Sequence, residues 1–172
     1  QPQGIYGQTK LEALNLIRTY RDNYHVKSVG AILFNHSSVY SKPAFLIPSI
    51  ARNLTEILGN KGPIKINNSE RLVDISRAEN FCEAFKSLMK TSADKDYIFS
   101  SGKLESIRNL YEQSLVRVAP HLLEQVLFDN RGTDLPSMYG DTSEISSIID
   151  WKGGGDLSET ILEIAEINSR YK

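Results

Sequence analysis

The chain has little cysteine: its 172 residues contain one, Cys82. A single cysteine has no partner within the chain, so an internal disulfide is excluded. Cys82 stands in the pattern Phe81-Cys82-Glu83-Ala84-Phe85, whose apolar residues recur at helical spacing. We therefore expect a buried structural thiol rather than a reactive one.

Charge of one sign and long apolar runs are also lacking. The 20 basic and 21 acidic residues give a net charge of -1 and form no basic stripe, which argues against nucleic acid as a partner. The longest apolar runs, such as Val29–Phe34, fall far short of the roughly 20 residues that span a bilayer, so we expect no membrane association. Neither a secretion signal nor a lipidation motif is visible, and a cytoplasmic location is the expectation.

Several signatures of enzyme sites are missing as well. No G-x-G-x-x-G lies between a strand and a helix, so no pyrophosphate cradle is visible. His25, His36 and His121 are scattered without the spacing of metal ligands, and we expect no metal site. The run Gly153–Gly155 lacks the lysine and hydroxyl of a P-loop, so we interpret it as a turn.

The sequence does contain alternating helical and strand patterns, which predict an α/β fold. Helices are predicted over residues 6–24, 48–58, 77–90, 104–115, 142–149 and 156–167, and strands over 26–34, 64–66, 71–75, 96–99 and 125–128. Ser76, with Glu79 three residues later, predicts a capping box for the third helix. The second half of strand 26–34 is apolar throughout, as in a strand covered on both faces. The polar residues 35–38 follow at its carboxyl end, where ligands bind in open α/β sheets.

One pair of residues in the first predicted helix suggests chemistry. Tyr6 and Lys10 are four residues apart, so they lie one turn apart on the same helix face. A lysine ammonium beside a phenol favours the phenolate form. Such a tyrosine can take a proton from a substrate hydroxyl while a hydride leaves the same carbon. The spacing also arises by chance on exposed helices, so on spacing alone both interpretations stay open.

Six short segments, taken in chain order, resemble a known family. They are Tyr6-Gly7 with Lys10, Ile32–Ser37, Asn68–Asp74, Asn80–Ala84, Arg131–Asp134, and Gly140-Asp141 followed by Trp151. The second segment is similar to the family's "ILFNHES", the third to "NLDAxRDW" and the fourth to "DYVEAM". In this order, from residue 6 to residue 151, the segments resemble the C-terminal half of extended short-chain dehydrogenases that act on nucleotide sugars, and within them the GDP-mannose 4,6-dehydratase family.

The resemblance implies a fold and an activity. The fold would comprise the last strands of a Rossmann-type sheet and a small α/β substrate-binding domain. Residues 1–40 would end the dinucleotide-binding domain, and residues 41–172 would bind substrate, with some segments returning to the sheet. The implied cofactor is NADP or NAD, and the implied reaction is a nucleotide-sugar 4,6-dehydration, a lyase reaction. An epimerase or reductase of the same family and a non-catalytic interaction module stay open as alternatives.

The resemblance also assigns roles to residues. It makes Tyr6 the acid/base, places Lys10 on the nicotinamide ribose and puts His36 near the dinucleotide. The substrate-binding residues that it implies are Asn35, Arg71 and Arg131. Simpler readings stay open: His36 satisfying a loop carbonyl, Asn35 stabilising a turn and Arg131 being solvated. The family's arginine before the aspartate of "RDW" is Val73 here, with Arg71 as its only nearby substitute, which leaves the nucleotide and the sugar open.

The same resemblance raises a question of assembly. The first helix and strand 26–34 would pack into a sheet that is built mostly by residues outside these 172. Alone they would expose a strand edge and an apolar face. We therefore expect a fragment of a longer enzyme, inactive in isolation, or a chain that covers these surfaces by association with the other half or with its own copies.

Overall fold

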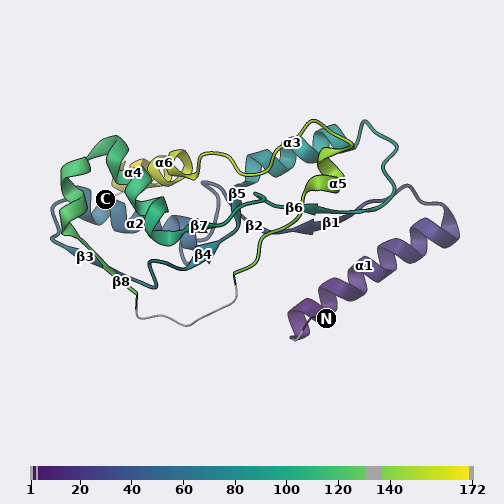
Figure 1. Cartoon of the computed structure of the whole chain (residues 1–172), viewed down its shortest axis with the longest axis horizontal. Helices are drawn as coiled ribbons and strands as arrows, with labels where there is room; N and C mark the ends of the chain where they lie inside the picture. The colour runs from purple at the N-terminus through teal and green to yellow at the C-terminus, as the bar shows by residue number, and fades with distance from the viewer. Residues whose placement is uncertain (1, 3, 131–136, 171–172) are drawn as a thin grey trace.

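The computed structural model describes residues 2, 4–130 and 137–170 and has the predicted α/β fold. The helices are α1 Ile5–Tyr24, α2 Leu46–Leu58, α3 Ala78–Leu88, α4 Ile107–Val118, η1 Pro120–Gln125, α5 Ser143–Ser146 and α6 Leu157–Arg170. The strands are β1 Gly30–Leu33, β2 Asn35–Ser37, β3 Ile64–Asn67, β4 Leu72–Val73, β5 Ile75–Arg77, β6 Asp96–Phe99, β7 Glu105–Ser106 and β8 Val126–Asp129. Figure 1 shows an elongated molecule, with α2, α4 and α6 at one end and α1, α3 and α5 at the other.

The described strands form four pairs, three of them parallel. β1 pairs with β6, β2 with β5 and β3 with β8, while β4 and β7 are antiparallel. The chain passes from β1 into β2 through Phe34 alone, whose amide donates to the Phe99 carbonyl at 2.9 Å. At this point the backbone changes its pairing partner from β6 to β5. Asn35 is the first residue after the change, in register with Ile75.

Two separate cores hold the ends of the molecule. One lies between α2, α4 and α6, with β3 and β8 packed against it. Its helices carry apolar residues at the predicted spacing, such as Ile47, Ile50 and Leu54 of α2, all buried. The other core is rich in aromatic residues. In it the ring centroids of Phe99 and Trp151 are 5.8 Å apart, and this contact joins β6 to the segment after α5. The predicted boundary between residues 40 and 41 stays a prediction.

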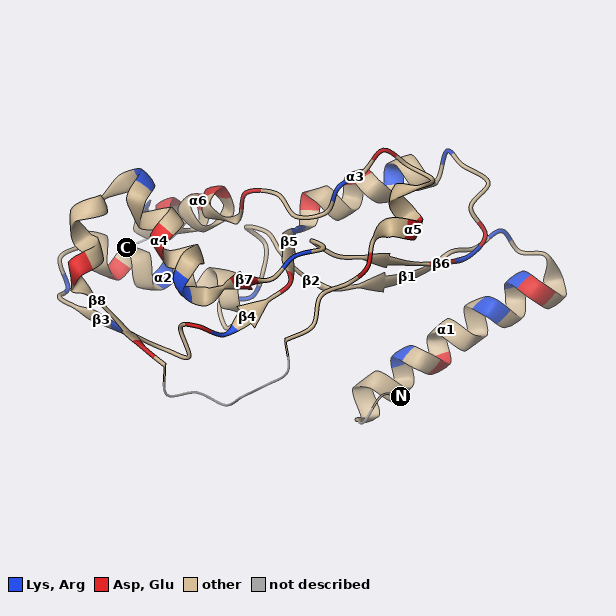
Figure 2. Ribbon diagram, in the orientation of Figure 1, with Lys and Arg blue, Asp and Glu red and all other residues tan. Residues whose placement is uncertain are grey.

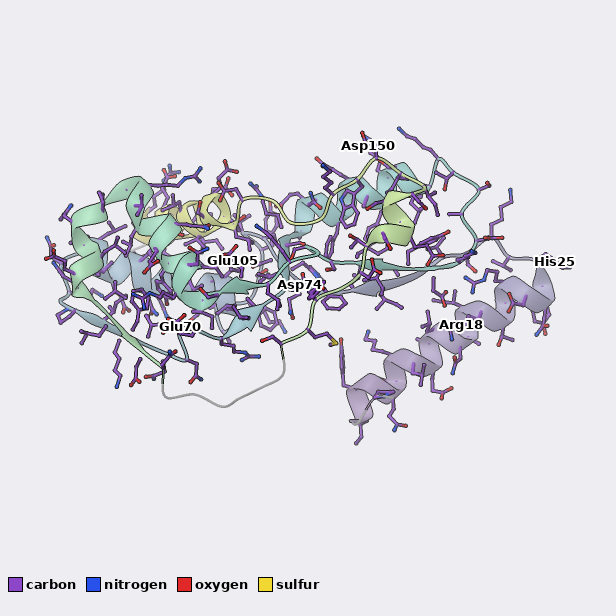
Figure 3. The ribbon with its side chains drawn as sticks, in the orientation of Figure 1. Arg18, His25, Glu70, Asp74, Glu105 and Asp150 are labelled. Atoms are coloured by element: carbon purple, nitrogen blue, oxygen red, sulfur yellow. The ribbon has the colours of Figure 1, made fainter. Side chains whose placement is uncertain are left out.

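Helix α1 is attached to the strands mainly by ion pairs. None of its side chains is fully buried. Arg18 Nε lies 2.6 Å and Arg21 Nη1 3.1 Å from the carboxylate oxygens of Asp96, at the start of β6; Arg18 is labelled on α1 in Figure 3. A side chain at Gly30 would overlap Leu14 of α1 and Asp96, so glycine lets the helix approach β1. Burial alone would raise the pKa of Asp96, but the hydrogen bonds and charges of Arg18 and Arg21 outweigh it and hold that pKa below its usual range.

Two predictions about α3 are wrong for identifiable reasons. Cys82 is exposed, because α3 buries the face of Phe81, Ala84 and Leu88 and the next residue points away from it. Ser76 belongs to β5, where its hydroxyl accepts from the Gly154 amide at 3.2 Å, and Arg77 takes the N-cap position instead.

The strand predicted over 26–34 is shorter than expected and ends in a second strand. β1 begins at Gly30, and residues 35–37, expected to follow the strand as a loop, pair with β5. Ile32 and Leu33 are 39% and 43% exposed, so the expected cover on both faces is also wrong for this chain. The described residues place β6 on one edge of β1 and no strand on the other. What covers that edge, a second copy or another polypeptide, stays a prediction.

Helix content gives no sign of a membrane span. Among the residues that the structure describes, no helix combines the length and apolarity needed to cross a bilayer. Figure 2 shows Lys and Arg interspersed with Asp and Glu over the ribbon.

The α1 attachment leads to a prediction about pH. Asp96→Asn should lower the free energy of unfolding by about 1 to 2 kcal/mol, between the values for exposed and buried pairs. Because the folded-state pKa of Asp96 is lowered, the ion pairs contribute fully above the unfolded value of about 3.9 and are lost as pH falls through the folded value. Hydrogen exchange rates of the α1 amides, measured between pH 7 and pH 3, report this loss of the ion pairs.

Asp22→Asn is the matched control, since Asp22 contacts Arg21 only at 3.6 Å and its side chain is 70% exposed. The control should keep α1 as protected as in the wild type. Equal protection of α1 in the Asp96→Asn variant at neutral pH would contradict the assigned attachment.

Candidate functional site

The first turns of α1 bring the predicted acid/base pair together. Lys10 Nζ lies 5.4 Å from the centroid of the Tyr6 ring, and both side chains are exposed. The helix backbone holds this turn in place, with the Gln8 amide donating to the Gly4 carbonyl at 2.9 Å. The two residues therefore share one helix face, as their spacing predicts.

The orientation of α1 places this pair toward the carboxyl end of β1. In Figure 1, α1 and β1 run in opposite directions, so the first turn of α1 lies toward the carboxyl end of β1. A pocket of about 360 Å³ opens where β1 ends. Its lining residues are Leu33, Phe34, Asn35, Arg71, Leu72, Val73, Asp74, Ser137 and Met138. The pocket thus joins Asn35 and Arg71, two of the three residues predicted to bind substrate.

Asn35 and His36 both have partners within the chain. Asn35 Nδ2 donates to the Asp74 carbonyl at 3.0 Å. His36 Nδ1 lies 3.0 Å from the Phe34 carbonyl, and its ring centroid is 5.4 Å from that of Phe81. Because a carbonyl oxygen only accepts, Nδ1 carries the hydrogen in that contact. His36 is not a lining residue of the pocket, and its predicted place near a dinucleotide stays a prediction.

Arg71 is the exposed cation of the pocket. Its backbone is fixed, with the amide donating to the Asn68 carbonyl at 3.0 Å and the carbonyl accepting from the Ile107 amide at 3.1 Å. Within the described part of the chain its guanidinium has no hydrogen bond or ion pair. Arg131, the third predicted substrate contact, lies outside the described residues.

Asp74 is the residue that sequence reasoning missed. Its side chain is buried, 2% exposed, and occupies the junction of β4 and β5 near the middle of the molecule (Figure 3). Oδ1 accepts from the Ser101 amide at 2.8 Å, and Oδ2 accepts from the Gly140 amide at 3.0 Å and from the Ser100 hydroxyl. A lone acid within an apolar strand segment was the available signal, since a buried charge needs partners.

Gly140 permits one of these contacts. A Cβ built on Gly140 would lie 2.6 Å from both Ile98 Cγ2 and Ser100 Cβ, closer than real Cβ atoms come. The absent side chain lets the backbone after Met138 reach Asp74 and Ser100. Residues 137 and 138 thereby form one wall of the pocket.

Comparison with known proteins identifies the family. The sequence pattern that defines the family described as GDP-mannose 4,6 dehydratase matches residues 1–164. The chain belongs to this family. A relative in Cricetulus griseus, a GDP-mannose 4,6 dehydratase, is 23% identical over 186 aligned residues that cover 96% of this chain and 50% of the relative. The Homo sapiens protein of the same description is 22% identical, with 95% and 50% covered. The chain therefore spans about half the length of these relatives.

Solved structures have the same fold at low sequence identity. RMD from Pseudomonas aeruginosa, complexed with NADPH, superimposes with a TM-score of 0.77 at 19% identity, over 96% of this chain and 56% of that one. The dTDP-glucose 4,6-dehydratase from Bacillus anthracis, in complex with NAD, superimposes with a TM-score of 0.73 at 15% identity, over 99% of this chain and 53% of that one. A UDP-glucuronic acid 4-epimerase from Bacillus cereus superimposes with a TM-score of 0.72 at 17% identity, over 100% of this chain and 55% of that one. These likenesses confirm the predicted fold class, that of the Rossmann-type extended short-chain dehydrogenases.

The chain carries no evident metal centre among its described residues, where no cluster of three His, Cys, Asp or Glu side chains could hold an ion.

The close approach at Gly140 leads to a second prediction. Gly140→Ala should lower the free energy of unfolding by about 1 to 3 kcal/mol, because the methyl group overpacks against Ile98 and Ser100. Chemical denaturation measures the loss. Gly4→Ala is the control, since a Cβ there meets nothing within 4 Å, and it should change stability far less. A Gly140→Ala chain as stable as the control would show that this backbone segment does not lie against Ser100.

Proposed function

We propose that this chain carries the acid/base pair and the substrate-binding side of a nicotinamide-dependent nucleotide-sugar 4,6-dehydratase, with a GDP-sugar as substrate. One observation carries the proposal. A Tyr6–Lys10 pair on one face of α1 lies toward the carboxyl end of β1, where Asn35 and Arg71 line a single pocket. Membership in the GDP-mannose 4,6 dehydratase family supports the same reading.

The residues of α1 fit a nicotinamide cofactor, NADP or NAD. In the described part of the chain the Lys10 ammonium has no acidic partner and the Tyr6 hydroxyl has no hydrogen bond, so both are free to contact ribose hydroxyls and a reacting sugar. When bound, such a cofactor accepts and returns a hydride. Lys10 would hold its ribose, and His36 would lie near the dinucleotide.

The other residues have roles that follow from their chemistry. The Tyr6 phenolate, which the Lys10 ammonium favours, takes the proton of a sugar hydroxyl and becomes a neutral phenol. Arg71 binds the substrate diphosphate, which a planar guanidinium contacts through two parallel hydrogen bonds. Arg131 is assigned to the same diphosphate by resemblance. Asn35 uses one amide hydrogen on Asp74, which leaves its Oδ1 and second hydrogen for the sugar nucleotide.

A second candidate is a nucleotide-sugar epimerase or reductase of the same family. Val73 lines the pocket at the position where the resemblance calls for an arginine, so the lining has Arg71 as its cation. A pocket with fewer cations suits a different nucleotide or sugar. A non-catalytic binding module is the third candidate.

Ligand titration separates these candidates. We expect the chain to bind GDP-mannose in calorimetry, and Arg71→Gln to raise the dissociation constant at least tenfold, because a charged hydrogen bond to the diphosphate is worth about 1.5 to 3 kcal/mol. Arg52→Gln is the matched control: its guanidinium sits on α2, bonded to Ser49 Oγ at 3.3 Å and outside the pocket lining. Tighter binding of another nucleotide sugar favours the second candidate. Binding of neither nucleotide sugars nor NADP favours the third.

The acid/base role has its own test. In any preparation of this protein that turns over a nucleotide sugar, Tyr6→Phe should cut turnover by at least about 100-fold, the scale of lost proton transfer. Substrate affinity should stay within about twofold, since the ring and its contact with Lys10 remain. Tyr20→Phe, on the same helix and 50% exposed, should leave both unchanged. Retained turnover in Tyr6→Phe would remove this residue from the mechanism.

A further inference from the structure

Three separate stretches of chain form the walls of the pocket at the end of β1. Residues 33–35 end β1, residues 71–74 run through β4, and residues 137–138 precede Gly140. The first two belong to strand pairs, whereas no described strand includes the third. Its position depends on other contacts, and these lead to one residue.

Asp74 belongs to one wall, contacts a second, and contacts Gly140, which follows the third. It lies within the second wall, and its carbonyl accepts from Asn35 Nδ2 of the first at 3.0 Å. Its carboxylate accepts from the Gly140 amide, beside the third wall, at 3.0 Å. Ser100 completes the link, since its hydroxyl donates to Asp74 and also lies 3.1 Å from the Gly140 amide and 3.2 Å from the Gly140 carbonyl.

We propose that Asp74 is a positioning residue that sets the shape of the substrate pocket: its carboxylate holds Gly140, and with it the segment 137–140, against the strand whose main-chain carbonyl at residue 74 holds Asn35. The ligand part of this inference rests on the proposed function. Asp74 does not act as an acid or base, because both carboxylate oxygens are occupied by donors from the chain and the side chain is buried. Its effect on the reaction passes through the groups that it aligns.

An amide cannot replace this carboxylate. In Asp74→Asn one oxygen position becomes an NH2 group. If that group faces Gly140, a donor meets the Gly140 amide, and if it faces Ser101, a donor meets the Ser101 amide. Either orientation breaks one of the two backbone contacts, although the size of the side chain is unchanged.

Amide hydrogen exchange tests the positioning directly, without any ligand. Asp74→Asn should raise the exchange rates of the Gly140 and Ser101 amides at least tenfold. Ser100→Ala should raise the rates at Gly140 and Gly102, whose amides contact the lost hydroxyl, and leave the rate at Ser101 unchanged, because the Ser101 amide donates to Asp74 Oδ1. Asp156→Asn is the matched control: Asp156 accepts from Ser158 and pairs with Arg117 at 2.9 Å, away from the pocket. The control should leave both amides as slow as in the wild type.

Binding of GDP-mannose tests the consequence at a temperature where every variant is fully folded by circular dichroism. Asp74→Asn should raise the dissociation constant at least tenfold and Ser100→Ala less, whereas Asp156→Asn should stay within twofold. A residue that serves only stability would leave the affinity of the folded protein unchanged. If Asp74→Asn does not fold, the Ser100→Ala pattern, fast exchange at Gly140 with slow exchange at Ser101 and a weaker affinity, supports the inference.

The outcomes separate the two proposals. Unchanged exchange at Gly140 in both variants, or fast exchange with an unchanged affinity, would overturn the positioning role of Asp74. A wild-type chain that binds no nucleotide sugar would overturn the proposed function, while the exchange pattern would still decide whether Asp74 holds the pocket walls.

Discussion

A buried carboxylate at the junction of β4 and β5 connects the two ends of the molecule. Removing a charge from water costs several kcal/mol unless hydrogen bonds replace the lost hydration. Asp74 meets that cost with three donors drawn from the end of β6 and from residue 140. These segments lie 26 to 66 residues further along the chain. Gly140 and Ser100 also contact each other, so the three groups form one connected hydrogen-bond network around the carboxylate.

Helix α1 is attached by ion pairs rather than by a hydrogen-bonded buried carboxylate. The two cores are apolar, but α1 is held by Arg18 and Arg21 on Asp96, in partly exposed positions. Ion pairs of this kind contribute less than burial of apolar surface and weaken with salt. The helix that carries Tyr6 and Lys10 is therefore held more weakly than the helices that pack in the two cores. Its exposed apolar side chains, with those of β1, form a surface suited to a further packing partner.

The fold class and most helices were predictable because their signals are local. Apolar residues at helical spacing fixed α2 and α6 to within a few residues. The second strand over residues 35–37, where a loop was expected, was not predictable, because it arises where the pairing partner changes from β6 to β5. Cys82 was misjudged since a helical pattern alone does not say how wide the buried face is. The role of Asp74 escaped because its partners are distant in sequence.

The pocket itself was predictable in part. Asn35 and Arg71 were expected to act together through resemblance, and the structure places both in one lining. The wall at residues 137–138 had no sequence signal, because it depends on the close approach of Gly140 to Ser100 rather than on a strand or helix pattern. Close backbone approaches of this kind require the three-dimensional arrangement before they can be recognised.

The same geometry explains why the pocket cation is available to an anion. Asp74 and Arg71 line one pocket, three residues apart, and an unoccupied carboxylate there would attract the guanidinium and neutralise it. The Asp74 oxygens instead point to Ser100, Ser101 and Gly140, so their hydrogen-bonding capacity is used within the protein. Among the residues that the structure describes, no acid pairs with Arg71, so its guanidinium donors face a diphosphate that enters the pocket.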